Sequence, residues 1–176
     1  MKFKTAVVIG RFQPFHLGHQ ELIESALALA ERVVVVVGSA CAARSLRNPF
    51  TADERIEMMK LNLPEPDRVR YVRVRDYFYN DSGWINEVRE KVREEAGSGT
   101  TAIVGHDKDS TSGYLKWFPE WERVELAGKK TGATNVTTTC HGTEIRESYL
   151  RDEKSTSIRT ELSIATKSWL MEFASR

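Results

Sequence analysis

Short apolar runs alternate with helical patterns of hydrophobic residues along the chain. Residues 5–9 form an apolar, β-branched run, and apolar residues then recur at helical spacing over about 19–31. Residues 33–37 are five consecutive valines. An apolar run without polar alternation is typical of a strand that is buried on both faces, as in a parallel sheet. The start of the chain therefore predicts a strand–helix–strand unit with parallel strands.

The same alternation continues towards the C-terminus. Thr51 and Glu54 have the spacing of a capping box and predict a helix over 51–62. Asp81 or Ser82 can cap a later helix. The further predicted elements are strands over 69–74 and 101–104, weaker strands over 123–126 and 134–138, and helices over 81–97, 115–118, 143–151 and 161–173. This alternation predicts an α/β fold with a doubly wound parallel sheet.

The loop after the first strand contains the strongest candidate site, because ligands of doubly wound sheets bind beyond the carboxyl ends of the strands. His16 and His19 lie three positions apart, around Gly18, where a helix is predicted to begin. Free backbone N–H groups at a helix start attract anions, and a glycine lets a phosphate approach the backbone. Arg11 adds a cation. Two unrelated surface histidines are the alternative, but the strand–turn–helix setting favours a phosphate site.

The segment GRFQPFHLGH, residues 10–19, resembles the signature of the HxGH nucleotidylyltransferases. Its wider form is similar to that of nicotinamide-nucleotide (NMN) adenylyltransferases of the archaeal type and of the bacterial type fused to a Nudix domain. The resemblance implies a Rossmann-like nucleotidylyltransferase fold over 1–176. It also implies that His16 and His19 hold the ATP phosphates, and that His19 stabilises charge in the transition state. The other ATP-site residues implied here are Gly10, Arg11, Phe12, Gln13 and Gly18.

The loop after the second strand holds a serine and several arginines. The stretch from Gly38 to Arg55 is similar to the second sequence block of the family. This similarity implies that Arg47 reaches the ATP phosphates and that Ser39 contributes to the NMN site. A polar loop that leads into a capped helix is the alternative. The role of Arg44 is left open, and Arg55 is expected to be a solvated residue of the following helix.

Aromatic residues surround Asn80 after the third predicted strand. Trp84 is expected near the open end of the sheet, where a cationic nicotinamide ring over an indole face gains about 0.5–2 kcal/mol. In the resembling family, an asparagine and a tryptophan of this block contact NMN. Asn80 and Trp84 are therefore predicted to bind NMN, whereas core packing stays the alternative for Tyr77 and Phe78.

The loop after the fourth strand, residues 105–112, is similar to the GHxKDxSSxYL block of the Nudix-fused enzymes. The resemblance implies that His106 lines the NMN site and that Lys108 meets a phosphate. A polar surface loop is the alternative, above all for Asp109 and Thr111.

Two segments near the C-terminus, 141–146 and 155–159, each offer a hydroxyl at a helix start and an arginine one turn later. The first follows a predicted strand, leads into a helical pattern and is similar to the GTE-(V/I)-R form of the archaeal enzymes. We therefore place Thr143 and Arg146 at the ATP phosphates. The C-terminal helical segment, about 152–176, has no assigned chemistry.

Composition narrows the class of protein. The chain has 176 residues, and its 26 Lys and Arg against 25 Asp and Glu give a net charge of +1. The length fits one domain, and the near-zero net charge argues against a nucleic-acid binder. Cys41 and Cys140 cannot form a disulfide framework, and no apolar stretch approaches the ~20 residues that cross a bilayer. A cytoplasmic protein without a membrane partner is expected. Residues 89–97 fail the Nudix frame, so no Nudix domain is expected.

The resemblance implies that the chain converts ATP and NMN to NAD⁺ and pyrophosphate, with His16, His19, Arg47 and Arg146 as catalytic residues. Mg²⁺ is the implied cofactor, carried by the ATP phosphates and not by a metal site of the protein. A different acceptor, such as nicotinate mononucleotide, is one alternative. A sensor that binds nucleotides without turnover is another. The resemblance also implies a homo-oligomer.

Overall fold

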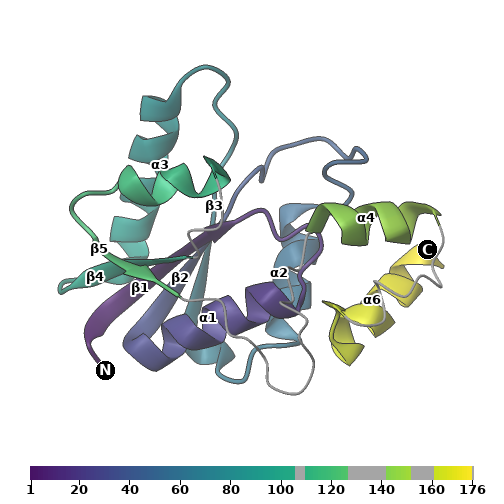
Figure 1. The fold of residues 1–176 in the computed structure, drawn as a ribbon, viewed down its shortest axis with the longest axis horizontal. Coiled ribbons are helices and arrows are strands. Elements are labelled where there is room, and N and C mark those ends of the chain that lie inside the picture. The colour runs from purple at the N-terminus through teal and green to yellow at the C-terminus, as the bar shows by residue number, and fades with distance from the viewer. Residues whose placement is uncertain (106–109, 127–141, 152–160, 176) are drawn as a thin grey trace.

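A five-stranded parallel sheet forms the centre of the computed structural model, which describes residues 1–105, 110–126, 142–151 and 161–175 (Figure 1). The strand order is β3-β2-β1-β4-β5, and every pairing is parallel. The predicted doubly wound α/β fold is therefore confirmed. The strands are β1 (Phe3–Gly10), β2 (Ala30–Val37), β3 (Val69–Arg73), β4 (Thr101–Gly105) and β5 (Glu122–Glu125).

The consecutive valines occupy the interior of the sheet. Each residue of 33–37 is 0 % exposed. Strand β2 pairs with β1 on one side and with β3 on the other, so that Val34 lies opposite Val7. Val33 and Val35 face one core cluster, and Val34 faces the other. The absence of polar alternation in this run thus reflects burial on both faces.

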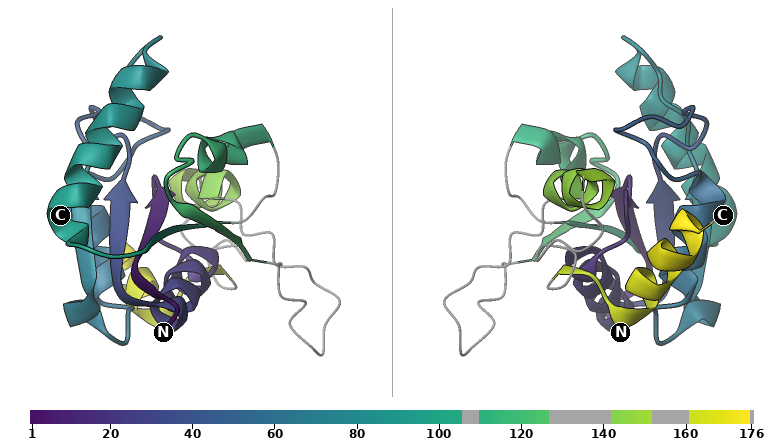
Figure 2. Two further views of the ribbon diagram at one scale, coloured as in Figure 1. Left: turned by 90° about the vertical axis from the view of Figure 1, so that its left-hand side faces the viewer. Right: turned by 90° about the vertical axis from the view of Figure 1, so that its right-hand side faces the viewer.

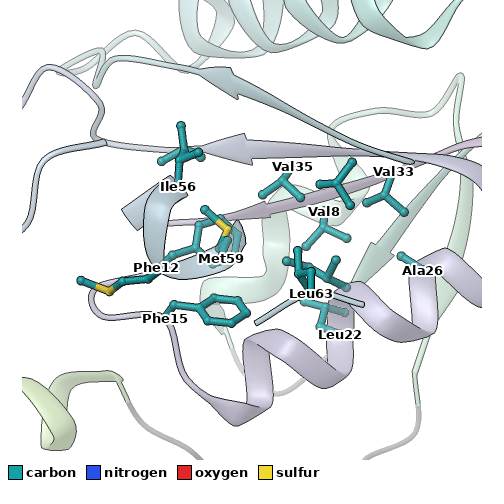
Figure 3. Packing of buried hydrophobic residues seen from close by; sticks show 14 of the residues in the cluster. Val8, Phe12, Phe15, Leu22, Ala26, Val33, Val35, Ile56, Met59 and Leu63 are labelled. Carbon is teal, nitrogen blue, oxygen red and sulfur yellow. The ribbon is translucent and has the colours of Figure 1, made fainter. Parts of the chain in front are cut away.

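Helices cover both faces of the sheet (Figure 2). Helices α1 (Leu17–Leu29) and α2 (Ala52–Lys60) pack on one face, whereas α3 (Asp81–Ala96) and the 3₁₀ helix η2 (Ser110–Lys116) pack on the other. A further 3₁₀ turn, η1 (Pro66–Arg68), precedes β3. Figure 3 shows the first face, with Leu22 and Ala26 from α1 and Ile56 and Met59 from α2 beside Val33 and Val35.

The chain reverses direction across the sheet next to β1. It runs outward through β2 to β3 and then returns through α3 to β4, on the other side of β1. Such a reversal opens a crevice at the carboxyl ends of the strands, where ligands of doubly wound sheets bind. Gly10, the last residue of β1, lies at this point.

Two C-terminal helices, α4 (Gly142–Arg151) and α6 (Ile164–Ala174), lie on the side of the molecule away from α3 (Figure 1). The ring of Phe50 contacts both, at centroid distances of 6.0 Å to Tyr149, 5.8 Å to Trp169 and 5.4 Å to Phe173. These contacts attach the C-terminal helices to the loop that precedes α2. Within the described part of the chain, no helix is both long and apolar enough to cross a membrane.

Several predicted boundaries shift, and one predicted cap is wrong. Helix α1 begins at Leu17, and β2 already begins at Ala30. Asn80 caps α3, instead of Asp81 or Ser82, because its Oδ1 accepts the N–H of Gly83 at 2.9 Å. The last helix begins at residue 164, not 161. The strand predicted over 134–138 lies outside the described residues.

Candidate functional site

The two histidines form a stacked pair at the start of α1. His16 is the N-cap residue of this helix, and its Nδ1 accepts the backbone N–H of His19 at 3.4 Å. The two rings stack with centroids 3.6 Å apart and planes at 23°. Because Nδ1 of His16 acts as an acceptor, the neutral ring carries its proton on Nε2. In this tautomer Nε2 is a hydrogen-bond donor.

Buried phenylalanines hold the ring of His19 in place. Phe12 meets it edge-on at a centroid distance of 4.8 Å, and Phe15 lies parallel to it at 6.0 Å. Both phenylalanines are 1 % exposed and point into the core (Figure 3). A Cβ at Gly10 would come within 2.9 Å of the Phe12 ring, so a side chain does not fit there. Gly10 and Phe12, predicted to bind ATP, thus have a packing role in this structure.

Helix α4 meets the histidine turn, although the two are distant in sequence. Arg146 is 8 % exposed, and its Nη1 donates to the carbonyl oxygen of Gln13 at 2.8 Å. Its Nη2 donates to Oγ1 of Thr143 at 2.9 Å. A Cβ at Gly142 would lie 3.7 Å from Nε2 of His16. The first turn of α4 therefore borders the same space as the first turn of α1. The competing segment, 155–159, lies outside the described residues.

The side chain of Gln13 fastens this turn to the chain before α2. Its Nε2 donates to the carbonyl oxygen of Phe50 at 2.8 Å, and its Oε1 accepts the N–H of Phe50 at 3.1 Å. Gln13 is 2 % exposed. Its side chain is thus committed to the protein backbone, which makes it a support of the predicted ATP site. Gly18, also predicted there, lies in the first turn of α1.

Three arginines, Arg11, Arg47 and Arg146, lie close enough for their charges to repel one another, and the charges of Asp76 and Glu147 offset this repulsion only in part. Burial lowers the pKa of Arg11, and the charge of Arg47 lowers it further. Burial, followed by the charges of Arg11 and Arg47, lowers the pKa of Arg146. Nη1 of Arg11 is buried and has no hydrogen-bond partner among the described residues. An anion bound here would relieve the repulsion and satisfy that donor.

The remaining arginines of the second loop are engaged elsewhere. Arg44 forms a two-pronged ion pair with Glu54, at 2.8 Å and 2.6 Å, and its guanidinium lies 5.4 Å from the centre of the Phe173 ring. The prediction for Arg55 was wrong, since its side chain is 0 % exposed. The helical spacing of buried residues 52, 55, 56 and 59 places it on the inward face of α2, a signal present in the sequence.

Arg55 is held by backbone oxygens. It donates to the carbonyls of Arg11, Gly38, Ser39 and Thr51. Burial lowers its pKa to about 10, and the nearby charge of Arg11 contributes to the shift.

Ser39 connects the loops after β2 and β3. Its hydroxyl donates to Oδ1 of Asp76 at 2.9 Å, and the backbone N–H of Ala40 donates to the carbonyl of Val74 at 3.0 Å. Ser39 is 8 % exposed and has a φ of +49°, which is uncommon for a residue with a side chain. The predicted NMN-site serine therefore lies in a buried, constrained turn.

The predicted acceptor residues after β3 are far more open. Asn80 is exposed, with its side chain at the start of α3. Trp84 is half-buried and packs against Trp117 at 5.9 Å and Phe118 at 6.1 Å. The alternative that Phe78 packs in the core is wrong, because this residue is 85 % exposed.

Other predicted positions are only partly covered by the structure. Tyr77 is half-buried, and its hydroxyl accepts a hydrogen bond from Arg75 at 2.8 Å. His106 and Lys108, predicted for the NMN site, lie outside the described residues. Within the described ranges, no group of three or more His, Cys, Asp and Glu side chains could hold a metal ion.

Sequence comparison places this chain among known proteins. The sequence model described as "Cytidylyltransferase-like" matches residues 7–157. A nicotinamide/nicotinic acid mononucleotide adenylyltransferase of Acinetobacter baylyi is 39 % identical over 151 residues, or 84 % of this chain and 76 % of that protein. A nicotinamide-nucleotide adenylyltransferase of Sulfurisphaera tokodaii is 52 % identical over 127 residues, or 69 % of this chain and 72 % of that protein.

Structural comparison agrees with the sequence comparison. A bifunctional NMN adenylyltransferase/ADP ribose pyrophosphatase of Francisella tularensis, solved with AMP and a manganese ion, superposes with a TM-score of 0.81 and 28 % identity. The match covers 99 % of this chain and 50 % of that one, so this chain spans about half the length of the bifunctional protein.

Proposed function

This chain belongs to the cytidylyltransferase-like family and is a nucleotidyltransferase, and we propose that it transfers the adenylyl group of ATP to NMN. A phosphate oxygen of NMN forms a bond to the α-phosphorus of ATP, and the bond to the bridging oxygen of the β-phosphate breaks. The products are NAD⁺ and pyrophosphate. The observation that carries the proposal is the stacked His16–His19 pair beside Arg11, Arg47 and Arg146.

The main obstacle to this reaction is repulsion between two polyanions. The second pKa of a phosphate monoester is near 6, so the attacking group of NMN is largely a dianion at pH 7 and needs no general base. Catalysis then consists of positioning and of neutralising charge. We assign the neutralising role to Arg11, Arg47 and Arg146. His16 and His19 donate to ATP phosphate oxygens, and His19 acts most strongly in the transition state.

We propose Mg²⁺, bound through the ATP phosphates, as the cofactor. The Francisella protein was solved with manganese, a related hard cation. Mg²⁺ usually keeps several waters and binds substrate phosphates, so a dedicated cage of protein ligands is not required. When bound, the ion neutralises phosphate charge. The described residues contribute the arginines and histidines named above.

The acceptor side of the proposal assigns the pyridine ring to Asn80 and Trp84, with Ser39 nearby. The half-buried indole of Trp84 lies in the first turn of α3 and supports this assignment as a flat aromatic surface close to Asn80 in sequence. His106 and Lys108 complete the proposed NMN site. Cytoplasmic location and a homo-oligomeric state also stay predictions.

One assay separates the candidate functions. The full chain is incubated with ATP, Mg²⁺ and either NMN or nicotinate mononucleotide, and dinucleotide formation and pyrophosphate release are measured. NAD⁺ formation from NMN supports the proposal, whereas turnover of nicotinate mononucleotide alone changes the acceptor. Calorimetric binding of ATP and NMN without any turnover would contradict the proposal and support a nucleotide sensor.

A further inference from the structure

The buried guanidinium of Arg55 joins two of the loops that border the candidate site. Its Nη1 donates to the carbonyls of Arg11, at 2.6 Å, and of Gly38, at 2.8 Å. Its Nη2 donates to the carbonyl of Ser39 at 3.2 Å, and its Nε donates to that of Thr51 at 3.0 Å. Arg11 follows β1, Gly38 and Ser39 follow β2, and Thr51 caps α2. One side chain thus connects three separate segments.

The chemistry of this connection requires a guanidinium. Arginine presents five N–H donors in a rigid planar fork, whereas lysine presents one compact ammonium group. A lysine at position 55 could keep the charge, but it could not reach backbone oxygens of all three segments in the same geometry. Arg55 is also 0 % exposed, so water cannot replace the lost bonds without rearrangement.

Two of the joined residues have side chains at the candidate site. Arg11 has a buried Nη1 without a hydrogen-bond partner among the described residues, beside the charges of Arg47 and Arg146. Ser39 has a φ of +49° and donates to Asp76. A residue with a side chain keeps such a positive φ only where the surrounding structure holds it there. The bond from Arg55 to the carbonyl of Ser39 is one such restraint.

We infer that Arg55 is a positioning residue for adenylyl transfer, because it fixes the loops after β1 and β2 relative to each other and thereby places the side chains of Arg11 and Ser39. This inference rests on the proposed function. Arg55 is not itself a catalytic residue, since its side chain is buried and bonded to backbone carbonyls. It acts through the residues that it holds.

The chain offers a control in Arg68, which also donates to backbone carbonyls, at the opposite end of β2, although its side chain is 24 % exposed and also pairs with Glu65. Its Nη2 donates to the carbonyls of Leu27 and Ala30, both at 2.7 Å, and its Nε donates to that of Glu31 at 3.1 Å. These carbonyls lie in the last turn of α1 and at the amino end of β2, whereas those of Gly38 and Ser39 follow the carboxyl end of β2. Arg68→Lys therefore removes a guanidinium that is bonded to several backbone carbonyls, at a place away from the candidate site.

The experiment compares Arg55→Lys with Arg68→Lys in the full chain. Urea unfolding, the calorimetric dissociation constant for ATP, and kcat and KM for NAD⁺ formation are measured for each variant. We expect both variants to lose stability. The kcat should fall only in Arg55→Lys, by about 10²-fold, because small misplacements of catalytic groups have effects of this size. The ATP affinity of Arg55→Lys should weaken by about tenfold, because a displaced Arg11 no longer makes its proposed charge-assisted hydrogen bond to an ATP phosphate. Arg68→Lys should stay within about threefold of wild type in both, as expected for a distant site.

Each possible outcome either supports or overturns the inference. Equal losses of kcat in the two variants, or an unchanged kcat in Arg55→Lys, overturn it. If Arg55→Lys does not fold, Arg55→Gln, which keeps two donors without the charge, replaces it under the same criteria. If neither folds, proton exchange at the Arg55 guanidinium of the wild-type protein is measured with and without ATP. Slower exchange with ATP supports the inference, and an unchanged rate overturns it.

The proposed function and this inference fail in distinguishable ways. ATP binding requires no acceptor. A wild-type protein that binds ATP but forms no NAD⁺ contradicts the proposed function, while the ATP affinities of Arg55→Lys and Arg68→Lys still test the positioning role.

Discussion

The loop after β1 and the loop after β3 border the same edge of the sheet, but their side chains are held very differently. In the first loop, Gln13 and His16 are 2 % and 6 % exposed, and Gln13 is bonded to Phe50. In the second, Phe78 is 85 % exposed, and Asn80 is also exposed. Arg146 adds a buried donor from α4 to the first loop.

This difference fits the chemistry proposed for each region. A triphosphate carries a high charge, and donors that are fixed in advance stabilise such charge without reorganisation during the reaction. The ring of an acceptor is recognised over a broader surface, and a loop can become ordered around it at some cost in affinity. The comparison therefore predicts that substitutions in the first loop reduce kcat strongly, whereas those in the second reduce acceptor binding more moderately.

The largest effect is expected from His19→Ala. Removing a donor that acts on the transition state lowers kcat by about 10²–10³-fold, or roughly 2.7–4 kcal/mol. The fold should survive, because His19 is a partly exposed residue at a helix start. Steady-state kinetics of NAD⁺ formation check the first expectation, and circular dichroism checks the second. A folded variant with near-normal kcat would remove His19 from the mechanism.

Arg146→Met should reduce both activity and stability. We expect kcat to fall by about 10²-fold, as for the loss of one charge-assisted donor at a reacting phosphate. The carbonyl of Gln13 would also lose its partner in a buried setting, at a cost of about 1–3 kcal/mol. Kinetics and urea unfolding measure the two effects.

The matched control for this variant is Arg151→Met, in the same helix. The side chain of Arg151 is 81 % exposed, and its ion pair with Glu147 is long, at 4.0 Å. Arg151→Met should leave kcat unchanged. Equal losses in the two variants would show that charge on α4, and not the position of Arg146, matters.

Much of the better-packed region could be predicted from the sequence, because local patterns determine it. The valine run predicted the buried strand, and the spacing of His16 and His19 placed both at a helix start. The pairing of Arg146 with Gln13 could only be expected through resemblance, since these residues are 133 positions apart. Contacts of this kind depend on how helices pack, which local pattern does not specify.

The errors have definite physical causes. Arg55 was expected in solvent because arginines are seldom fully buried without a partner. Its partners are backbone carbonyls, which a sequence does not display. Phe78 was weighed as a core residue because of its apolar ring, but an exposed aromatic on a loop has no sequence signature.

Trp84→Ala tests the acceptor side and should have a moderate effect. Loss of stacking on a cationic ring corresponds to about 0.5–2 kcal/mol, so the KM for NMN should rise by roughly 2–30-fold with little change in the KM for ATP. Trp84→Phe keeps an aromatic face against Trp117 and Phe118 and should lie between the variant and wild type. Equal shifts in both KM values would show that Trp84 only packs the domain.

The smallest effect is expected from Phe78→Ser, with Phe15→Ala as its counterpart in the first loop. Phe78 is 85 % exposed, so its loss should change the free energy of unfolding by less than about 0.5 kcal/mol. Phe15 is 1 % exposed and lies beside His19, and its truncation should cost about 3–5 kcal/mol. Urea unfolding measures both. A destabilisation by Phe78→Ser close to that of Phe15→Ala would mean that the loop after β3 packs as firmly as the loop after β1. The contrast between the two regions would then be lost.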